Sequence, residues 1–181
     1  MTADLHTPRL LLRRWRESDR DPFARLNADP RVMEYFPAPL SRGDSNLMVD
    51  RIQDHFDRYG HGLWAAELPS TAEFIGFIGL NVPTFESHFT PCVEIGWRLA
   101  FEHWGRGLAT EGARAVLHHA FTTLALPEIV AFAAAGNLRS RRVMEKLGMT
   151  YNPHDDFHHP RLKEGHPLRP HVLYRKLQCA S

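Results

Sequence analysis

A glycine-rich segment, Trp104-Gly-Arg-Gly-Leu-Ala109, has the residue types and spacing best suited to chemistry. Its two glycines let the main chain turn tightly and approach a ligand closely. A strand pattern precedes the segment and a helical pattern follows it, so its N–H groups would open a helix. Such a helix start attracts phosphate, and Arg106 can add a charge-assisted hydrogen bond. The segment is therefore a candidate pyrophosphate loop, although it also fits a plain glycine-rich turn.

Two other phosphate-binding motifs do not fit this segment. A P-loop ends in Gly-Lys-Ser/Thr, which is absent here. A dinucleotide-binding loop carries Gly-x-Gly-x-x-Gly directly after the first strand. In this chain Gly105-x-Gly107 continues to Thr110 and lies late in the sequence, so a dinucleotide fold is not expected.

Apolar periodicity predicts the elements that would position the loop. Alternating residues predict a strand over residues 91–99, and helical spacing over residues 113–124 predicts a helix after the loop. A continuous apolar run at residues 129–133 is typical of a buried strand. Asn137 is the predicted N-cap of a further helix, for which Gly148 fits the position just after the end.

The rest of the chain predicts further strands and helices. In chain order these are a strand at residues 9–15, a short helix capped by Ser18 or Asp19, an amphipathic helix from Asp44, a hairpin of residues 63–68 and 73–80, a long loop at 153–170 and a last strand at 171–177. Strands and helices alternate in this order. We therefore expect one α/β domain, residues 7–178, with a mixed central sheet flanked by helices.

Composition and charge limit the class of protein. The 22 Lys and Arg residues nearly balance the 21 Asp and Glu residues, so no overall field favours nucleic acid or an acidic membrane. Apolar stretches are too short to span a bilayer and the N-terminus lacks a secretory pattern, so we expect a cytoplasmic protein. Cys92 and Cys179 are then expected to be reduced, and their spacing predicts no metal site.

Several stretches, in this order, resemble the GNAT N-acetyltransferase superfamily. The loop at residues 104–109 is similar to its acyl-CoA pyrophosphate motif, Gln/Arg-x-x-Gly-x-Gly/Ala, with Trp104 in the first position. More closely, the chain resembles the branch that includes the ribosomal-protein N-terminal alanine acetyltransferases, over residues 7–149. The stretches that carry this resemblance are Thr7-Pro-Arg-Leu-Leu-Leu-Arg13, Glu94-Ile-Gly-Trp-Arg-Leu99, Trp104 to Glu111, and Asn137 to Gly148.

The resemblance implies a GNAT fold, whose two central parallel strands splay apart, and acetyl-CoA as cosubstrate. The pantetheine arm would lie beside residues 92–99 and pair with their backbone like an added strand. One backbone N–H there would stabilise the oxyanion. The residues implied to hold the cosubstrate are Trp97, Arg98, Leu99, Trp104, Gly105, Arg106, Gly107, Leu108, Ala109, Thr110 and Asn137.

Acetyl transfer to an amine needs a neutral amine, a polarised carbonyl and a stabilised thiolate. Glu94 is the candidate general base, acting through water, unless an arginine or solvent occupies its carboxylate. The tyrosine with which many superfamily members protonate the thiolate would fall at Met144, so Ser140 is the candidate donor. Ser140 also fits a backbone hydrogen bond, and Asn137 also fits an ordinary N-cap.

The acceptor stays open at this point between a peptide N-terminus and a small amine. Met144 also leaves open a CoA-binding module without catalysis, and both a monomer and a homodimer remain compatible with the sequence. Tyr35, Trp64 and Phe85 fit either an amine-binding wall or the core. The histidines of residues 154–171 are typical of a surface loop, and a metal site or the lining of a substrate pocket is the alternative.

Overall fold

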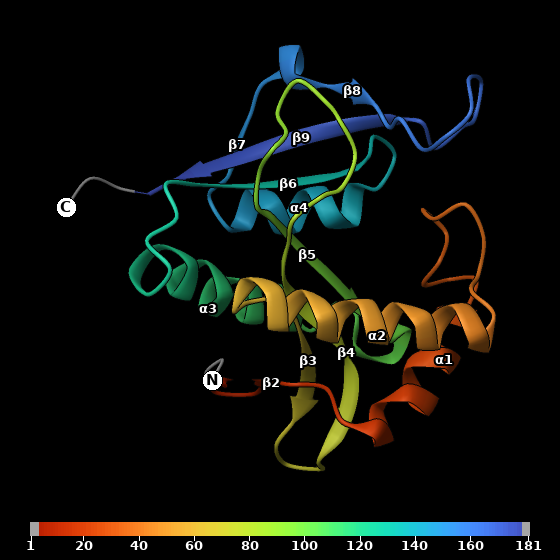
Figure 1. The fold of residues 1–181 in the computed structure, drawn as a ribbon, viewed down its shortest axis with the longest axis vertical. Coiled ribbons are helices and arrows are strands. Elements are labelled where there is room, and N and C mark those ends of the chain that lie inside the picture. Colours follow the sequence, from red (N-terminus) through yellow and green to blue (C-terminus); the bar gives the residue numbers. More distant parts are fainter. Residues whose placement is uncertain (1–3, 179–181) are drawn as a thin grey trace.

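The computed structural model describes residues 4–178, so Cys179 lies outside it. Within these residues a nine-stranded mixed sheet has the order β1-β2-β3-β4-β5-β6-β9-β7, with β8 paired to β9 (Figure 1). The strands are β1 (Leu5–His6), β2 (Leu11–Arg13), β3 (Leu63–Leu68), β4 (Glu73–Asn81), β5 (Glu94–Leu99), β6 (Glu128–Ala134), β7 (Thr150–Tyr151), β8 (Phe157–His158) and β9 (Pro170–Leu177). The helices are α1 (Arg20–Ala28), α2 (Arg42–Tyr59), α3 (Leu108–Thr122) and α4 (Leu138–Lys146), with short turns η1 (Glu17–Asp19), η2 (Phe101–His103) and η3 (Pro153–Asp155).

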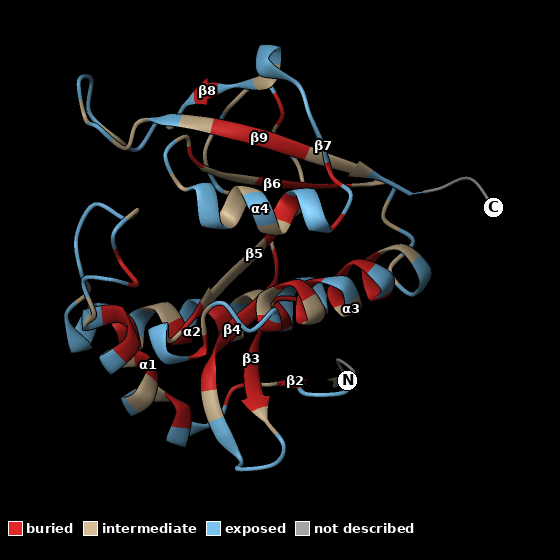
Figure 2. Ribbon diagram, turned by 180° about the vertical axis from the view of Figure 1, so that it is seen from behind, coloured by how far each residue is buried: buried red, intermediate tan, exposed pale blue. Residues whose placement is uncertain are grey.

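Helices cover both faces of the sheet, as neighbouring residues of β4 show. The ring of Phe77 packs against Phe23 of α1 with centroids 6.0 Å apart. Ile78 points to the other face, where α3 comes so close that a Cβ on Gly112 would lie 2.4 Å from the Ile78 side chain. Figure 2 shows buried residues along β3, β4 and β9 and on α3. The predicted α/β fold class with a mixed sheet is confirmed.

The two central parallel strands, β5 and β6, pair at one position only. Glu94 is opposite Val130, and the Val130 N–H donates to the Val93 carbonyl at 3.0 Å. In contrast, β4 pairs with β5 over its whole length, from Asn81 and Glu94 to Gly76 and Leu99. The strands therefore diverge after Glu94, as Figure 1 shows, and the expected splay is confirmed.

Local caps set the ends of two helices. Ser41 accepts a hydrogen bond from the Asp44 N–H, so α2 begins at Arg42 rather than at the predicted Asp44. Asn137 accepts from the Ser140 N–H in the same way and starts α4. After α4, Gly148 has a φ of 67°, a left-handed conformation that glycine adopts readily, which confirms its expected place.

The expected capping of α1 by Ser18 or Asp19 is wrong. Asp19 precedes α1 but makes no side-chain cap. Its carboxylate instead accepts from Arg13 at 2.7 Å and from the Arg16 N–H at 2.7 Å. Arg13 also pairs with Glu67 of β3, so this buried ion-pair group joins β2, η1 and β3. A buried arginine needs such partners, and this need outweighs a helix cap.

Several boundaries differ from the sequence prediction, among them that of the strand expected at residues 9–15, of which β2 covers only Leu11–Arg13. The strand expected over residues 91–99 begins only at Glu94, and the segment that contains Pro91 lies outside it. The long loop expected at 153–170 contains η3 and β8, and β7 precedes it. Two-residue strands such as β7 and β8 carry too little alternation to be detected from sequence, and they form here because β9 offers a long partner.

Candidate active site

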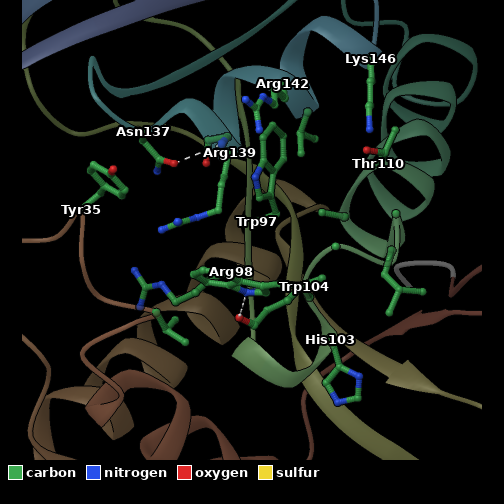
Figure 3. Close-up of a pocket in the computed structure, with 18 of the residues that line it drawn as sticks. Tyr35, Trp97, Arg98, His103, Trp104, Thr110, Asn137, Arg139, Arg142 and Lys146 are labelled. Carbon is green, nitrogen blue, oxygen red and sulfur yellow. Dashed lines mark hydrogen bonds between the residues drawn. The ribbon is translucent and has the colours of Figure 1, made fainter.

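A cavity of about 300 Å³ lies where β5 and β6 separate (Figure 3). Its walls come from the loop after α1, the end of β5, the glycine-rich loop with α3, and α4. It takes in eleven of the residues that the sequence analysis proposed. These are Trp97, Arg98, Leu99, Trp104, Gly105, Gly107, Leu108, Ala109, Thr110, Asn137 and Ser140. Glu94 and Arg106 do not line it.

The glycine-rich loop places the start of α3 at this cavity. Gly105 and Gly107 have φ angles of 72° and 77°, which most other residues avoid. The first i to i−4 hydrogen bond of α3 runs from the Glu111 N–H to the Gly107 carbonyl at 3.0 Å. The N–H groups of residues 108–110 therefore have no acceptor within the helix. A phosphate placed there would meet free donors and the positive end of the helix dipole.

An ion pair between Arg9 and Glu111, which lie 102 positions apart in the sequence, holds this loop in shape. Glu111 accepts hydrogen bonds from the Thr7 hydroxyl at 2.7 Å and from Arg9 Nε at 2.7 Å. Arg9 in turn donates from Nη1 to the Arg106 carbonyl at 2.9 Å. The side chain of Arg106 does not line the cavity, and its Nη1 lies 3.3 Å from Nδ1 of His103, which does line it. The loop is thus braced through the backbone of Arg106.

Successive residues of β5 present their side chains to opposite faces of the sheet. Trp97 is opposite Ile78 of β4, on the face that α3 covers. Arg98 is opposite Phe77, on the face that α1 covers. Both line the cavity, which therefore reaches both faces through the gap between β5 and β6. The Trp104 indole N–H donates to the Leu99 carbonyl at 2.8 Å and fixes the end of β5.

Asn137 and Ser140 lie side by side at the start of α4. The Asn137 Oδ1 accepts from the Ser140 N–H at 3.1 Å, so this oxygen is committed to capping while the amide nitrogen is left for a ligand. The Ser140 hydroxyl makes no hydrogen bond within residues 4–178 and lines the cavity. Met144 is buried in the core. The position where a tyrosine was expected by resemblance therefore serves packing in this chain.

The sequence analysis missed several lining residues. Arg139, Arg142 and Lys146 recur at helical spacing on α4 and face the cavity (Figure 3). Phe36 reaches it from the loop after α1. Its neighbour Tyr35, which the sequence offered for either an amine-binding wall or the core, lines the cavity as well. The helical spacing of the three cations on α4 is a signal in the sequence that could have found them. Nothing local to Phe36 indicates that it packs on Arg98 of β5.

Glu94 lies at the first position of β5, outside the cavity. Burial raises the pKa of Glu94 to about 7, although a hydrogen bond from the Asn81 amide, at 3.3 Å, lowers it. No ion pair involves Glu94 within the described residues, so the alternative that an arginine occupies it does not apply. Its carboxyl thus exchanges a proton near neutral pH, while its distance from Trp97 along the strand is about 10 Å.

The other candidate groups take structural places. Trp64 is fully buried, and Phe85 packs with Phe89, Phe132 and Phe157 over β6 and β9. His159 and His171 join this aromatic cluster. Burial raises the pKa of Cys92 to about 11, which keeps its thiol protonated and poorly nucleophilic. No group of three or more metal-ligand side chains occurs in residues 4–178, and no helix there could cross a membrane.

A second hollow of about 590 Å³ adjoins the first and shares Gly107, Thr110 and Lys146 with it. Arg114 contributes further positive charge to its walls, whereas Arg9 in the same hollow is paired with Glu111. The two hollows together form a basic path around the start of α3. Such a path suits a long ligand that carries several phosphate groups.

Comparison with known proteins places this geometry in a family. Residues 9–150 match the model of the acetyltransferase (GNAT) domain family. YkkB of Bacillus subtilis is 36% identical over 149 residues, which cover 82% of this chain and 86% of that protein. The crystal structure of an acetyltransferase from Agrobacterium tumefaciens is 30% identical and superposes with a TM-score of 0.79 over 98% of this chain and 96% of that one.

A solved ribosomal L7/L12 α-N-protein acetyltransferase, RimL, in complex with coenzyme A, has a TM-score of 0.77 over 97% of this chain and 98% of its own. Its identity of 15% makes this a similarity of fold alone. The family match covers most of the chain and includes the loop, β5 and the start of α4. The chain therefore belongs to the GNAT family of acetyltransferases.

Proposed function

We propose that this enzyme transfers the acetyl group of acetyl-CoA directly to a primary amine bound in the cavity. The observation that carries the proposal is a cavity that begins between two separating strands and ends on the unpaired N–H groups of α3. A thioester arm fits the gap as an added strand, and a diphosphate fits the helix start.

The cations around this path support coenzyme A as the ligand. The diphosphate would lie against the N–H groups of residues 108–110, with Arg142 and Lys146 of α4 above it. Arg114 and Lys146 in the adjoining hollow would meet the nucleotide end. Asn137 would use its free amide nitrogen on the pantetheine arm.

The transfer itself forms one N–C bond and breaks one C–S bond. The neutral amine attacks the thioester carbonyl, and a backbone N–H of β5 stabilises the oxyanion. The nitrogen gives up its proton through water to Glu94, which a carboxyl with a pKa near 7 can accept. The leaving thiolate takes a proton from the Ser140 hydroxyl, which solvent then restores.

The test uses the purified full-length protein with acetyl-CoA and a panel of amines. The panel holds amino acids, polyamines and short peptides with free N-termini. We expect thiol release only when an amine is present, with one acetyl group gained per thiol by mass spectrometry. Calorimetry with CoA alone measures whether the protein binds the cosubstrate, which is the first step of the proposal. CoA binding without thiol release for any amine would indicate a binding module, and absence of CoA binding would reject the site.

A further inference from the structure

Arg98 is a guanidinium in the cavity wall without an acidic partner. Its only hydrogen bonds within residues 4–178 come from Nη1, to Asn27 Oδ1 at 2.6 Å and to the Met48 sulfur at 3.9 Å. Nε is buried without any partner in this part of the chain. Burial lowers the pKa of Arg98 to about 10, so it is still protonated at neutral pH. A desolvated charge of this kind is costly unless an anion accompanies it.

The neighbour that could supply a counter-charge is an amide. Asn27 is fully buried on α1, and its own nitrogen donates to the Ser45 hydroxyl at 2.9 Å. An aspartate there would neutralise Arg98 at hydrogen-bond distance. The protein instead holds the guanidinium with a neutral oxygen and with the Phe36 ring, 4.1 Å away. The positive charge is therefore kept available in the cavity.

The phosphates of CoA would not lie beside the Arg98 guanidinium. The start of α3, where the diphosphate would bind, lies on the face of the sheet that Trp97 shares. Arg98 lies on the opposite face, against α1 and α2. On that face the next residues of β5 with the same orientation are Gly96 and Glu94. An anion bound to Arg98 would thus lie on the same face of β5 as Glu94, the candidate base. The acceptor amine must lie near Glu94 as well.

The three positions along β5 leave room for a ligand between two charged groups. A Cβ built on Gly96 would have the Glu94 carboxyl as its nearest contact, at 3.9 Å. The strand surface between Glu94 and Arg98 is therefore open. Nη2 of Arg98 has no hydrogen bond within residues 4–178 and, unlike Nε, is not fully buried, so it is the nitrogen that can donate to a carboxylate there.

We propose that Arg98 binds a carboxylate of the acceptor, so that the substrate class is an amine that also carries an acidic group. This inference rests on the proposed function. The carboxylate can belong to a free amino acid or to an acidic side chain next to a peptide N-terminus. Both present the same chemistry to Arg98, with the amine directed toward Glu94.

The first experiment measures kcat/KM for matched acceptors that differ only in this group. One arm compares amino acids with their amides, and the other compares peptides with Asp or Asn as the second residue. We expect a preference for the acid of about 10- to 100-fold in one arm, because a hydrogen-bonded charge is worth about 1.5–3 kcal/mol. The arm that shows the preference identifies the source of the carboxylate.

Two variants then test whether Arg98 causes the preference. Arg98→Met removes the charge, and Asn27→Asp leaves Arg98 in place but gives it an internal partner. Both should bring the acid-to-amide ratio close to 1. Arg14→Met is the matched control, since Arg14 also stacks on a phenylalanine, 4.6 Å from the Phe56 ring, but does not line the cavity. Its ratio should equal that of the unmodified protein.

The outcomes separate the two proposals. Thiol release with neutral amines and no preference for acids in either arm overturns the role of Arg98 and leaves acetyl transfer intact. A preference that survives both Arg98→Met and Asn27→Asp overturns it as well. If Arg98→Met fails to fold, Asn27→Asp decides alone. No thiol release with any amine removes the proposed function, and this inference falls with it.

Discussion

Glu94 is a carboxyl whose protonation state changes near neutral pH. Burial raises the pKa of Glu94 to about 7, so the carboxylate fraction grows as the pH rises through that value. If Glu94 accepts the proton of the amine, kcat/KM should rise over the same range. Glu94→Gln should lower kcat/KM about 100-fold and remove this rise, because general bases contribute about 10²–10⁴-fold. Thiol release measured from pH 5.5 to 9 provides the profile.

The control for Glu94 is Glu128→Gln. Glu128 occupies the first position of the neighbouring strand β6 but pairs with Arg175 and does not line the cavity. Its profile should match that of the unmodified protein. A Glu94→Gln enzyme that keeps the rise near pH 7 would show that another group titrates there, and Glu94 would lose its role as base.

The proposed diphosphate site depends on the backbone conformation of Gly107. Its φ of 77° is strained for any residue with a Cβ. Gly107→Val should weaken CoA binding about tenfold or more, since such strain is worth about 1–3 kcal/mol. Calorimetry with CoA measures the change. Gly165→Val is the control, because Gly165 has a φ of 79° on a distant loop, and it should cost stability while CoA affinity is retained.

At the scale of elements, Glu111 connects the first two strands to α3. Hydrogen bonds from Thr7 and Arg9 keep the pKa of Glu111 below its ordinary value, although burial raises it. The same arginine holds the Arg106 carbonyl. Two motifs of the family resemblance, at residues 7–13 and 104–111, are thus one connected unit. The sequence shows both motifs but not their contact, because about a hundred residues separate them.

Glu111→Gln should loosen this unit. We expect CoA affinity to fall several-fold, because the brace on the loop depends on Arg9, which loses its ionic partner. Thermal unfolding should shift down by a few degrees. Glu17→Gln is the control, since Glu17 pairs with Arg20 on an exposed surface. A drop in melting temperature with unchanged CoA affinity would mean that Glu111 only stabilises the fold.

Long, strongly patterned elements could be predicted from the sequence, whereas tertiary partners could not. The periodicity of residues 113–124 and the Asn137 cap define α3 and α4 well because both are local properties. The capping role of Asp19 was wrong because Arg13 of β2 binds its carboxylate in the folded chain. β7 and β8 depend on β9, so no local pattern marks them.

The same distinction applies to the candidate site. The backbone of the glycine-rich loop follows from its own residues, and so does its place before a helix. The sequence offers Tyr35 as either a wall or a core residue, but the contact of its neighbour Phe36 with Arg98 of β5 exists only in the folded chain and could not be predicted. The orientation of Arg98 also depends on pairing, since the β4–β5 register decides which face it takes.

At the scale of the whole molecule, histidines that the fold shields from water make stability fall at low pH. Burial lowers the pKa of His61 and of His159 to about 4, and it lowers the pKa of His55, His119 and His171 as well. In the unfolded chain such histidines titrate near 6.5. Between pH 6.5 and 4 the unfolded chain therefore binds more protons than the folded one. Stability is full above pH 6.5 and is lost as the pH falls.

Glu94 has the opposite effect on how stability depends on pH. Its pKa is about 7 in the folded protein and 4.5 ordinarily, so between these values the folded chain holds the extra proton. Its contribution therefore favours the folded state at low pH and weakens as the pH rises. One carboxyl opposes five histidines, so the net effect of these groups is acid destabilisation.

The variant His61→Phe tests how much one of these histidines contributes to the loss of stability in acid. His61 is 7% exposed and its Nδ1 lacks a partner within residues 4–178, so an apolar ring of similar shape can replace it. The variant should take up about one proton fewer on unfolding between pH 6.5 and 4. Its free energy of unfolding at pH 4 should therefore be higher by at most about 3 kcal/mol. Urea unfolding at a series of pH values measures the slope. Equal slopes for His61→Phe and the unmodified protein would show that the fold does not lower the pKa of His61.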